Sequence, residues 1–132
     1  MVERVTVGAK RIDAIVRVPD ERFMRTSAIP GLAEEILALF PGLLRHRCEC
    51  GSAHGIAAEL ADTELAHLLE HVTLEIAALA GSPRTLAGET RWDFAADGRG
   101  VFRVSLDYDD DLVMLGALRG AAALLAALLA RG

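Results

Sequence analysis

The stretch His67-Leu68-Leu69-Glu70-His71-Val72-Thr73-Leu74-Glu75 lies at the centre of the most strongly periodic segment of this chain. Placed on a helix, the large apolar side chains of this segment gather in one arc: Leu65, Leu68, Leu69, Val72, Ile76 and Leu79. Asp62 or Thr63 can cap the start of the helix, and Gly81-Ser82-Pro83 ends it near Ala80. The pattern predicts an amphipathic helix whose apolar face packs on a sheet.

Two strands and another helix are predicted on the N-terminal side of this segment. Residues 2–7 and 12–18 alternate apolar and polar side chains around turn residues 8–11, which is typical of a pair of strands joined by a turn. Ser27 can cap a further helix that runs to about Phe40. The N-terminal third is therefore expected to supply one hairpin and one helix.

The remaining elements are predicted from turn signals and apolar runs. Segment 43–49 is a candidate short strand before the central helix. Residues 90–94 and 101–108 flank Asp97-Gly98-Arg99-Gly100, which is a hairpin signal, and 112–130 form an apolar closing helix. Because hairpins imply antiparallel pairing, the predicted fold class is α+β, a two-layer sandwich with a mainly antiparallel sheet and about three helices.

Composition and charge limit the class of protein. A chain of 132 residues with 52% hydrophobic residues is long enough for one domain, 1–132, with a buried core, and it is not disordered. Its formal net charge of −5 argues against nucleic-acid binding, which needs clustered Lys and Arg. Cys48 and Cys50 are too close for an unstrained disulfide, which favours a reducing, cytoplasmic location.

The closing segment 112–130 is the one candidate for a membrane span. Its length would suffice, but Arg119 stands in its middle and the aspartates at 109–111 precede it, which suits the positive end of a helix dipole. We therefore expect a buried or subunit-interface helix and no membrane contact. A chain this short covers such a helix poorly on all sides, so the sequence predicts a homo-oligomer.

Two histidines on the central helix have the spacing of metal ligands. His67 and His71 are related as i and i+4, so their ring nitrogens can converge on one tetrahedral ion. Glu70 lies beside them, where it can reach a water molecule at the ion. The order HxxEH is the inverse of HExxH and is a signature of zinc hydrolases. The pattern predicts a zinc site with Glu70 as the catalytic residue.

The third metal ligand is not determined by this motif. Glu75, one turn further along the helix, is the first choice, with Asp107, Cys48 and Cys50 as competitors. An alternative interpretation is that the histidines and glutamates form a solvated polar stripe held by Glu–His contacts. That alternative needs no metal.

A second cluster of potential ligands precedes the central helix. His46, Cys48, Cys50 and His54 have an HxCxCxxxH spacing, which differs from the usual CxxC knuckle. Its interpretations are a loop with one buried thiol, a structural zinc site, or a Cys–His nucleophile pair without an evident orienting group. Lys10 is the only lysine and no Walker-type loop occurs, which excludes a P-loop nucleotide enzyme.

From about Leu43 to Gly132 the sequence resembles the N-terminal domain of cyanophycin synthetases, the enzymes that polymerise aspartate and arginine. The helix block 63–75 is the most specific part of the match. The other matching parts are the Cys48-containing run into Gly55, residues 79–81, 88–91 and 101–108, and the Ala-rich final helix. The family's Gly-Gly after the Cys run is His54-Gly55 in this chain.

The resemblance implies a module that holds the polymer and, in some members, an inverted zinc peptidase that cuts it. His67 and His71 would then be zinc ligands, Glu70 the general base and Glu75 a further ligand. The family's ligase parts lie outside this sequence, so we expect no ligation and, as a partner, a separate ligase or synthetase.

Two functions follow as hypotheses. The first is a zinc-dependent peptide or isopeptide hydrolase acting on an Asp/Arg polymer such as cyanophycin or a related peptide. In it, Asp107 would pair with guanidinium groups, and Arg84 and Arg91 would bind carboxylates. The alternative is a non-catalytic polymer-binding or assembly module.

Overall fold

The computed structural model describes residues 1–46 and 59–131. Its sheet has four antiparallel strands in the order β1-β2-β4-β3. The strands are β1 (Val2–Val7), β2 (Arg11–Arg17), β3 (Gly88–Arg91) and β4 (Val101–Asp107). The α-helices are α1 (Leu32–Leu39), α3 (Leu65–Leu79), α4 (Phe94–Asp97) and α5 (Asp111–Arg131), with 3-10 turns η1 (Glu21–Phe23), η2 (Thr26–Ala28) and η3 (Pro41–Arg45).

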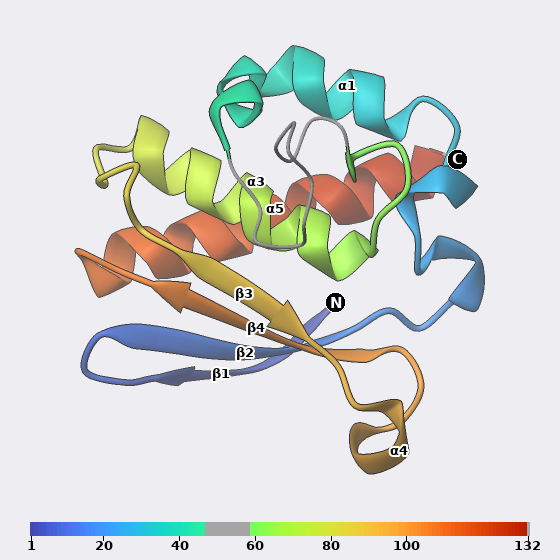
Figure 1. Cartoon of the computed structure of the whole chain (residues 1–132), viewed down its shortest axis with the longest axis horizontal. Coiled ribbons are helices and arrows are strands. Elements are labelled where there is room, and N and C mark those ends of the chain that lie inside the picture. The colour runs from blue at the N-terminus through green and yellow to red at the C-terminus, as the bar shows by residue number, and fades with distance from the viewer. Residues whose placement is uncertain (47–58, 132) are drawn as a thin grey trace.

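The helices α3 and α5 lie across one face of the sheet, and α1 lies on their side away from it (Figure 1). The predicted α+β sandwich with an antiparallel sheet is therefore confirmed, and its three longer helices are α1, α3 and α5. The predicted first hairpin is also confirmed, because β1 pairs with β2 from Val2↔Val16 to Val7↔Ile12. The central helix begins at Leu65 and ends at Leu79, close to the predicted bounds.

The connection between β3 and β4 is longer than the predicted tight turn. The two strands pair as expected, with Thr90 opposite Val104. However, α4 interrupts the connection because the Asp93 side chain accepts a hydrogen bond from the Ala96 amide and caps a short helix. Gly98 and Gly100, both with positive φ, then return the chain to β4.

Two local predictions near the middle of the chain are wrong. The helix expected from Ser27 is split into η2 and α1, because Gly31 adopts a left-handed conformation with φ of 80° between them. Residues 43–45 of the candidate strand belong to η3, since Pro41 occupies the start of that turn and favours helical dihedrals. His46 follows η3 as its C-cap residue, and residues 47–49 of the candidate strand, together with Cys50 and His54, lie outside the described residues.

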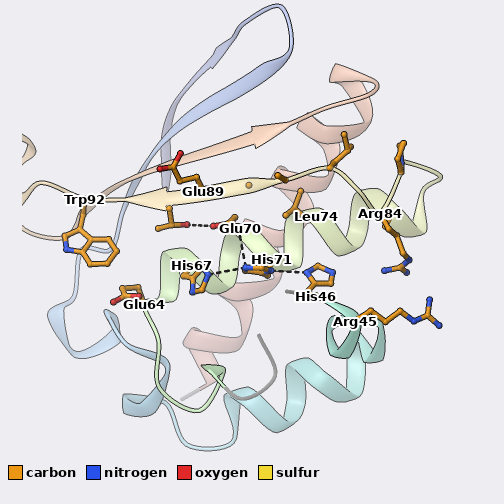
Figure 2. Close-up of a pocket in the computed structure, with 16 residues that line it drawn as sticks. Arg45, His46, Glu64, His67, Glu70, His71, Leu74, Arg84, Glu89 and Trp92 are labelled. Carbon is orange, nitrogen blue, oxygen red and sulfur yellow. Dashed lines mark hydrogen bonds and ion pairs between the residues drawn. The ribbon is translucent and has the colours of Figure 1, made fainter. Parts of the chain in front are cut away.

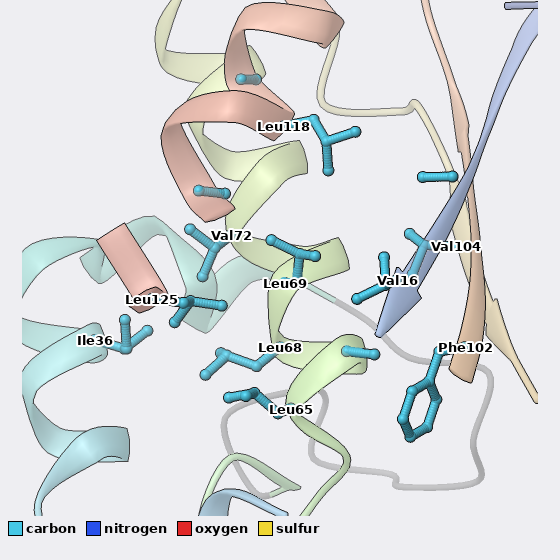
Figure 3. Packing of buried hydrophobic residues seen from close by; sticks show 14 of the residues in the cluster. Val16, Ile36, Leu65, Leu68, Leu69, Val72, Phe102, Val104, Leu118 and Leu125 are labelled. Carbon is cyan, nitrogen blue, oxygen red and sulfur yellow. The ribbon is translucent and has the colours of Figure 1, made fainter. Parts of the chain in front are cut away.

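The core lies where α3 meets the sheet, α5 and α1 (Figure 3). Apolar side chains from all four regions are fully buried there, and each such burial stabilises the fold by about 1.5–3 kcal/mol. The labelled members of this core are Val16, Ile36, Leu65, Leu68, Leu69, Val72, Phe102, Val104, Leu118 and Leu125. Enclosure on several sides explains why almost all of α3 is buried, polar residues included.

Helix α5 packs one face on α3 and leaves the other exposed. Its buried residues are Met114, Ala117, Leu118, Ala121, Leu125 and Leu128. Asp110 caps the start, because its Oδ1 accepts hydrogen bonds from the amides of Leu112 and Val113. By length and hydropathy alone α5 could cross a membrane, and 33% of its most apolar window is buried within the structure.

Candidate metal centre

The polar residues of α3 are buried, which excludes the interpretation of a solvated stripe. His67, Glu70, His71 and Glu75 are only 9%, 4%, 4% and 1% exposed. They are covered because β3 and η3 lie on the side of α3 that carries them. A cleft of about 650 Å³ opens beside them and is lined by residues from η3, α3, β3 and the α3–β3 connection (Figure 2).

The structure brings His67, Glu70 and His71 together. The Nε2 atoms of His67 and His71 are 3.1 Å apart, and Glu70 Oε2 lies 3.4 Å from His71 Nε2. Donor atoms of all three residues lie within 4.8 Å of one another. A tetrahedral ion with bonds near 2.1 Å separates its ligand atoms by about 3.4 Å. The two spacings of 3.1 and 3.4 Å are close to that distance, so the histidine pair can hold a zinc-sized ion with Glu70 beside it.

The outer nitrogens of both histidines have partners that orient the rings. His67 Nδ1 lies 2.9 Å from the hydroxyl of Thr63, a residue that is 3% exposed. His71 Nδ1 lies 3.0 Å from Nδ1 of His46. Such contacts to the far side of a histidine are what hold the rings of metal ligands in place. With their Nδ1 atoms engaged, both rings direct Nε2 toward the same point.

Glu70 is held against β3. Its Oε1 accepts a hydrogen bond of 2.8 Å from the Thr90 hydroxyl. Gly88 makes room for it, since a Cβ at that position would come within 2.8 Å of Glu70 Cγ. Burial raises the pKa of Glu70 to about 7, although the Thr90 hydrogen bond opposes the shift. A carboxyl group with a pKa near neutrality can both accept and return a proton.

Both histidines of the pair have lowered pKa values. Burial is the main cause, and it brings the pKa of His71 to about 3, with the neighbouring His67 and His46 adding to the shift. Burial likewise lowers the pKa of His67, against the attraction of Glu64 and Glu59. The imidazoles are therefore neutral at pH 7, which is the state that binds a metal.

Glu75, the sequence's first choice for a third ligand, is engaged elsewhere. Its Oε1 accepts hydrogen bonds from Arg84 Nη1 at 2.7 Å and from His46 Nε2 at 2.9 Å. Burial acts to raise the pKa of Glu75, but the hydrogen bonds of Arg84 and His46 outweigh it and leave the pKa below its usual value. Glu75 is not part of the group formed by His67, Glu70 and His71.

The sequence names His46 as a potential ligand but does not place it beside His71 and Glu75. It groups His46 with Cys48, Cys50 and His54, which lie outside the described residues. Instead, its ring lies between His71 and Glu75, with centroids of the two imidazoles 5.2 Å apart. The contact joins residues 25 positions apart in the chain, and no periodic pattern signals it.

Of the three predicted substrate-binding residues, Arg84 lines the cleft, whereas Arg91 and Asp107 do not. Arg84 lines the cleft, but its guanidinium is paired with Glu75. Arg91 is not among the cleft-lining residues; it is exposed on β3 and lies 3.5 Å from Glu89, with which it forms an ion pair. Asp107 is also outside the cleft, at the end of β4, where it pairs with Arg11 of the adjacent strand at 3.0 Å. At that position Asp107 is not part of the group formed by His67, Glu70 and His71.

Comparisons with known proteins identify relatives over most of this chain. Residues 15–130 match the family described as "Cyanophycin synthase-like N-terminal domain". A cyanophycin synthetase of Synechocystis sp. is 31% identical over 87 residues, which are 65% of this chain and 10% of that protein. A cyanophycin synthetase of Geminocystis herdmanii is 30% identical over 84 residues, 63% of this chain and 9% of that protein. The chain thus spans about a tenth of the length of the curated relatives it matches.

Proposed function

Because this chain belongs to the family of cyanophycin synthase-like N-terminal domains, we propose that it is a zinc-dependent hydrolase of peptide or isopeptide bonds. The observation that carries the proposal is the convergence of His67, His71 and Glu70 beside an open cleft. Neutral imidazoles are ligands that zinc commonly binds, and Glu70 lies beside them, where its carboxylate can reach a water molecule at the ion. The inverse motif HxxEH on α3 agrees with that assignment.

Glu70 carries out the proton transfers in this proposal. A zinc ion bound by the histidines would polarise the substrate carbonyl and make water more acidic. The Glu70 carboxylate takes a proton from the water whose oxygen bonds to the carbonyl carbon. As the C–N bond breaks, Glu70 gives that proton to the leaving nitrogen. Glu70 is then a carboxylate again, as it was at the start. Thr90 and Gly88 hold Glu70 in place for both steps.

The substrate class follows from the relatives and from the charges of the cleft. The relatives are cyanophycin synthetases, which supports an Asp/Arg polymer such as cyanophycin or a related peptide. Arg45 and Arg84 lie at one end of the cleft, whereas Glu64 and Glu89 lie toward the other (Figure 2). Opposite charges at the two ends suit a substrate with both carboxylate and guanidinium groups.

A second candidate is a non-catalytic polymer-binding or assembly module. One observation favours it: among the described residues, every buried side-chain nitrogen and oxygen has a hydrogen-bond partner without any ion. A network satisfied in this way is stable as a purely structural feature. In this case the cleft holds the polymer, and a separate ligase or synthetase acts on it.

Metal analysis combined with a cleavage assay distinguishes the two functions. We expect the purified chain to hold one zinc and to cut an Asp/Arg polymer. His67→Ala should lose both properties, whereas Glu70→Gln should keep zinc and lose cleavage by about 10²–10⁴-fold. Glu34→Gln, an exposed change on α1, is the matched control and should keep both. Polymer binding by a zinc-free, inactive wild type would establish the module instead.

The remaining expectations concern where and how the chain works. We expect a cytoplasmic protein, without membrane contact, that forms a homo-oligomer through the exposed face of α5. Light scattering at micromolar concentration tests the oligomer, and a monomer there contradicts it. Neither expectation changes the assignment of the site on α3.

A further inference from the structure

Four side chains form a continuous chain of hydrogen bonds behind the histidine pair. Arg84 donates to Glu75 through Nη1 at 2.7 Å and Nη2 at 3.2 Å. Glu75 Oε1 lies 2.9 Å from His46 Nε2, and His46 Nδ1 lies 3.0 Å from His71 Nδ1. Arg84 follows α3, Glu75 and His71 lie on it, and His46 follows η3. The chain ends at His71, which contacts both His67 and Glu70.

The direction of the protons along this chain is set by its two charged members. An arginine only donates, so the Glu75 carboxylate that it contacts is an acceptor. His46 Nε2 must then carry a proton and donate it to Glu75 Oε1. In the neutral form of His46 that one proton is on Nε2, so His46 Nδ1 is an acceptor. With His46 in this form, His71 Nδ1 donates to His46, and His71 Nε2 keeps its lone pair.

The carboxylate at the start of the chain is held rigidly. Glu75 is 1% exposed, and Gly42 of η3 lies directly against it. A Cβ at position 42 would come within 2.1 Å of Glu75 Oε2 and 2.7 Å of its carboxyl carbon. The close approach of the Gly42 backbone therefore requires a glycine. Displacing the carboxylate would break its contacts with both Arg84 and His46.

We propose that Arg84, Glu75 and His46 are positioning residues that hold His71 as the tautomer protonated on Nδ1, with Nε2 directed at the proposed metal. The part of this inference that concerns metal affinity rests on the proposed function, whereas the tautomer of His71 does not. The proposal makes Glu75 a positioning residue instead of a metal ligand. It also accounts for the hydrogen bonds that His46 and Arg84 donate to the buried Glu75 carboxylate. Loss of such outer contacts typically weakens metal binding about 10–100-fold.

The tautomer can be measured directly in the metal-free chain. Long-range ¹H–¹⁵N NMR spectra of the ¹⁵N-labelled full chain distinguish a protonated ring nitrogen from an unprotonated one. We expect His71 of the wild type to carry its proton on Nδ1. In His46→Phe, which keeps the ring but removes the acceptor, a mixture of both tautomers should appear. A wild type with the His71 proton on Nε2 overturns the inference.

Zinc titrations of the same variants measure the effect on affinity. His46→Phe should raise the Kd for zinc about 10–100-fold, and His46→Asn, whose Oδ1 lies where Nδ1 was, should recover most of the loss. Cobalt substituted for zinc should give the same visible spectrum in wild type and His46→Asn. A Kd for His46→Phe within twofold of wild type overturns the positioning role.

Gly42→Ala displaces Glu75 without changing any member of the chain. We expect it to weaken zinc binding and to mix the His71 tautomers as His46→Phe does. Gly116→Ala on α5, where an added Cβ meets nothing within 4 Å, is the matched control and should change neither property. Circular dichroism confirms that each variant is folded. If the wild type binds no zinc but its His71 tautomer responds as expected, the positioning role stands and the proposed function fails.

Discussion

Glu70 and Glu75 are the same residue type, lie one and a half turns apart on α3, and are buried to nearly the same degree, yet their chemistry differs. Burial raises the pKa of Glu70 to about 7, because among the described residues its hydrogen-bond donor is the uncharged Thr90 hydroxyl and it forms no ion pair with an arginine. Glu75, which contacts Arg84 and His46, has a pKa below its usual value. One carboxyl group is suited to exchanging protons, and the other stays ionised at neutral pH.

The difference comes from what each carboxyl group meets across the cleft. β3 presents a glycine and a hydroxyl to Glu70, whereas η3 and the segment after α3 present a glycine, an imidazole and a guanidinium to Glu75. A backbone glycine provides the space in both cases. The charge of the nearest partner then decides whether burial or attraction dominates.

The largest expected effect is on the pH dependence of stability in the metal-free chain. The folded pKa of Glu70 lies above its unfolded value, so stability falls as pH rises from about 4.5 to 7. The difference between wild type and Glu70→Gln, measured by urea unfolding with a chelator present, isolates this term from the histidines, whose lowered pKa values act in the opposite direction. Between pH 5 and 8 that difference should change by roughly 2–3 kcal/mol in favour of the variant.

In the same urea unfolding experiment, Glu75→Gln should change the pH dependence of stability in the opposite direction. The folded pKa of Glu75 is below its unfolded value, so its contribution is present at neutral pH and is lost as pH falls below about 4.5. The variant should be less stable than wild type at pH 7, and the difference should shrink in acid. Parallel pH profiles for the two glutamine variants would remove the distinction between the two carboxyl groups.

The next largest effects are expected from substituting the two glycines that lie against these carboxyl groups. Gly88→Ala places a Cβ within 2.8 Å of Glu70, and Gly42→Ala places one within 2.1 Å of Glu75. Each should cost about 1–2 kcal/mol of stability through overpacking. Their functional effects should separate, with Gly88→Ala reducing cleavage at unchanged zinc affinity and Gly42→Ala reducing zinc affinity. Cleavage assays at saturating zinc, together with zinc titrations, measure the two effects, and identical outcomes would contradict separate roles.

A smaller effect is expected from Thr90→Val, which removes the hydroxyl that donates to Glu70 and keeps the shape of the side chain. Loss of this hydrogen bond should raise the pKa of Glu70 further and cost about 1 kcal/mol at pH 8. The cost should shrink at pH 5, where Glu70 is protonated in either protein. Unfolding at the two pH values checks this, and an equal cost at both would show that the hydroxyl does not act on the ionised carboxyl group.

Asp107→Asn should have the smallest effect and shows what a carboxylate does outside the cleft. Asp107 is partly exposed and pairs with Arg11, which is itself 42% exposed. Such pairs contribute about 0–1 kcal/mol, and we expect a change of about 0.5 kcal/mol or less with unaltered cleavage. Thermal unfolding and the cleavage assay measure both. A marked loss of cleavage would restore Asp107 to the substrate-binding role that the sequence suggested.

The elements that the sequence predicted well are those with a strong local pattern. The apolar period of 65–79, the alternation of the first hairpin and the apolar run of α5 all match observed elements. The predictions that were wrong involve local conformation that no periodicity signals, namely the left-handed Gly31 and the 3-10 turn after Pro41. At the site, i and i+4 spacing was enough to place His67 beside His71.

The amino-acid sequence alone determined that α3 exists and that two imidazoles and a carboxyl group share one side of it, because helical geometry depends only on residues a few positions apart. Whether that side meets water or protein was decided by the tertiary structure, since β3 and η3 come from distant parts of the chain. The partners of Glu70 and Glu75 were decided in the same way. Since those partners and the burial they bring determine each pKa, the distinction between proton carrier and fixed anion arises only in the folded chain.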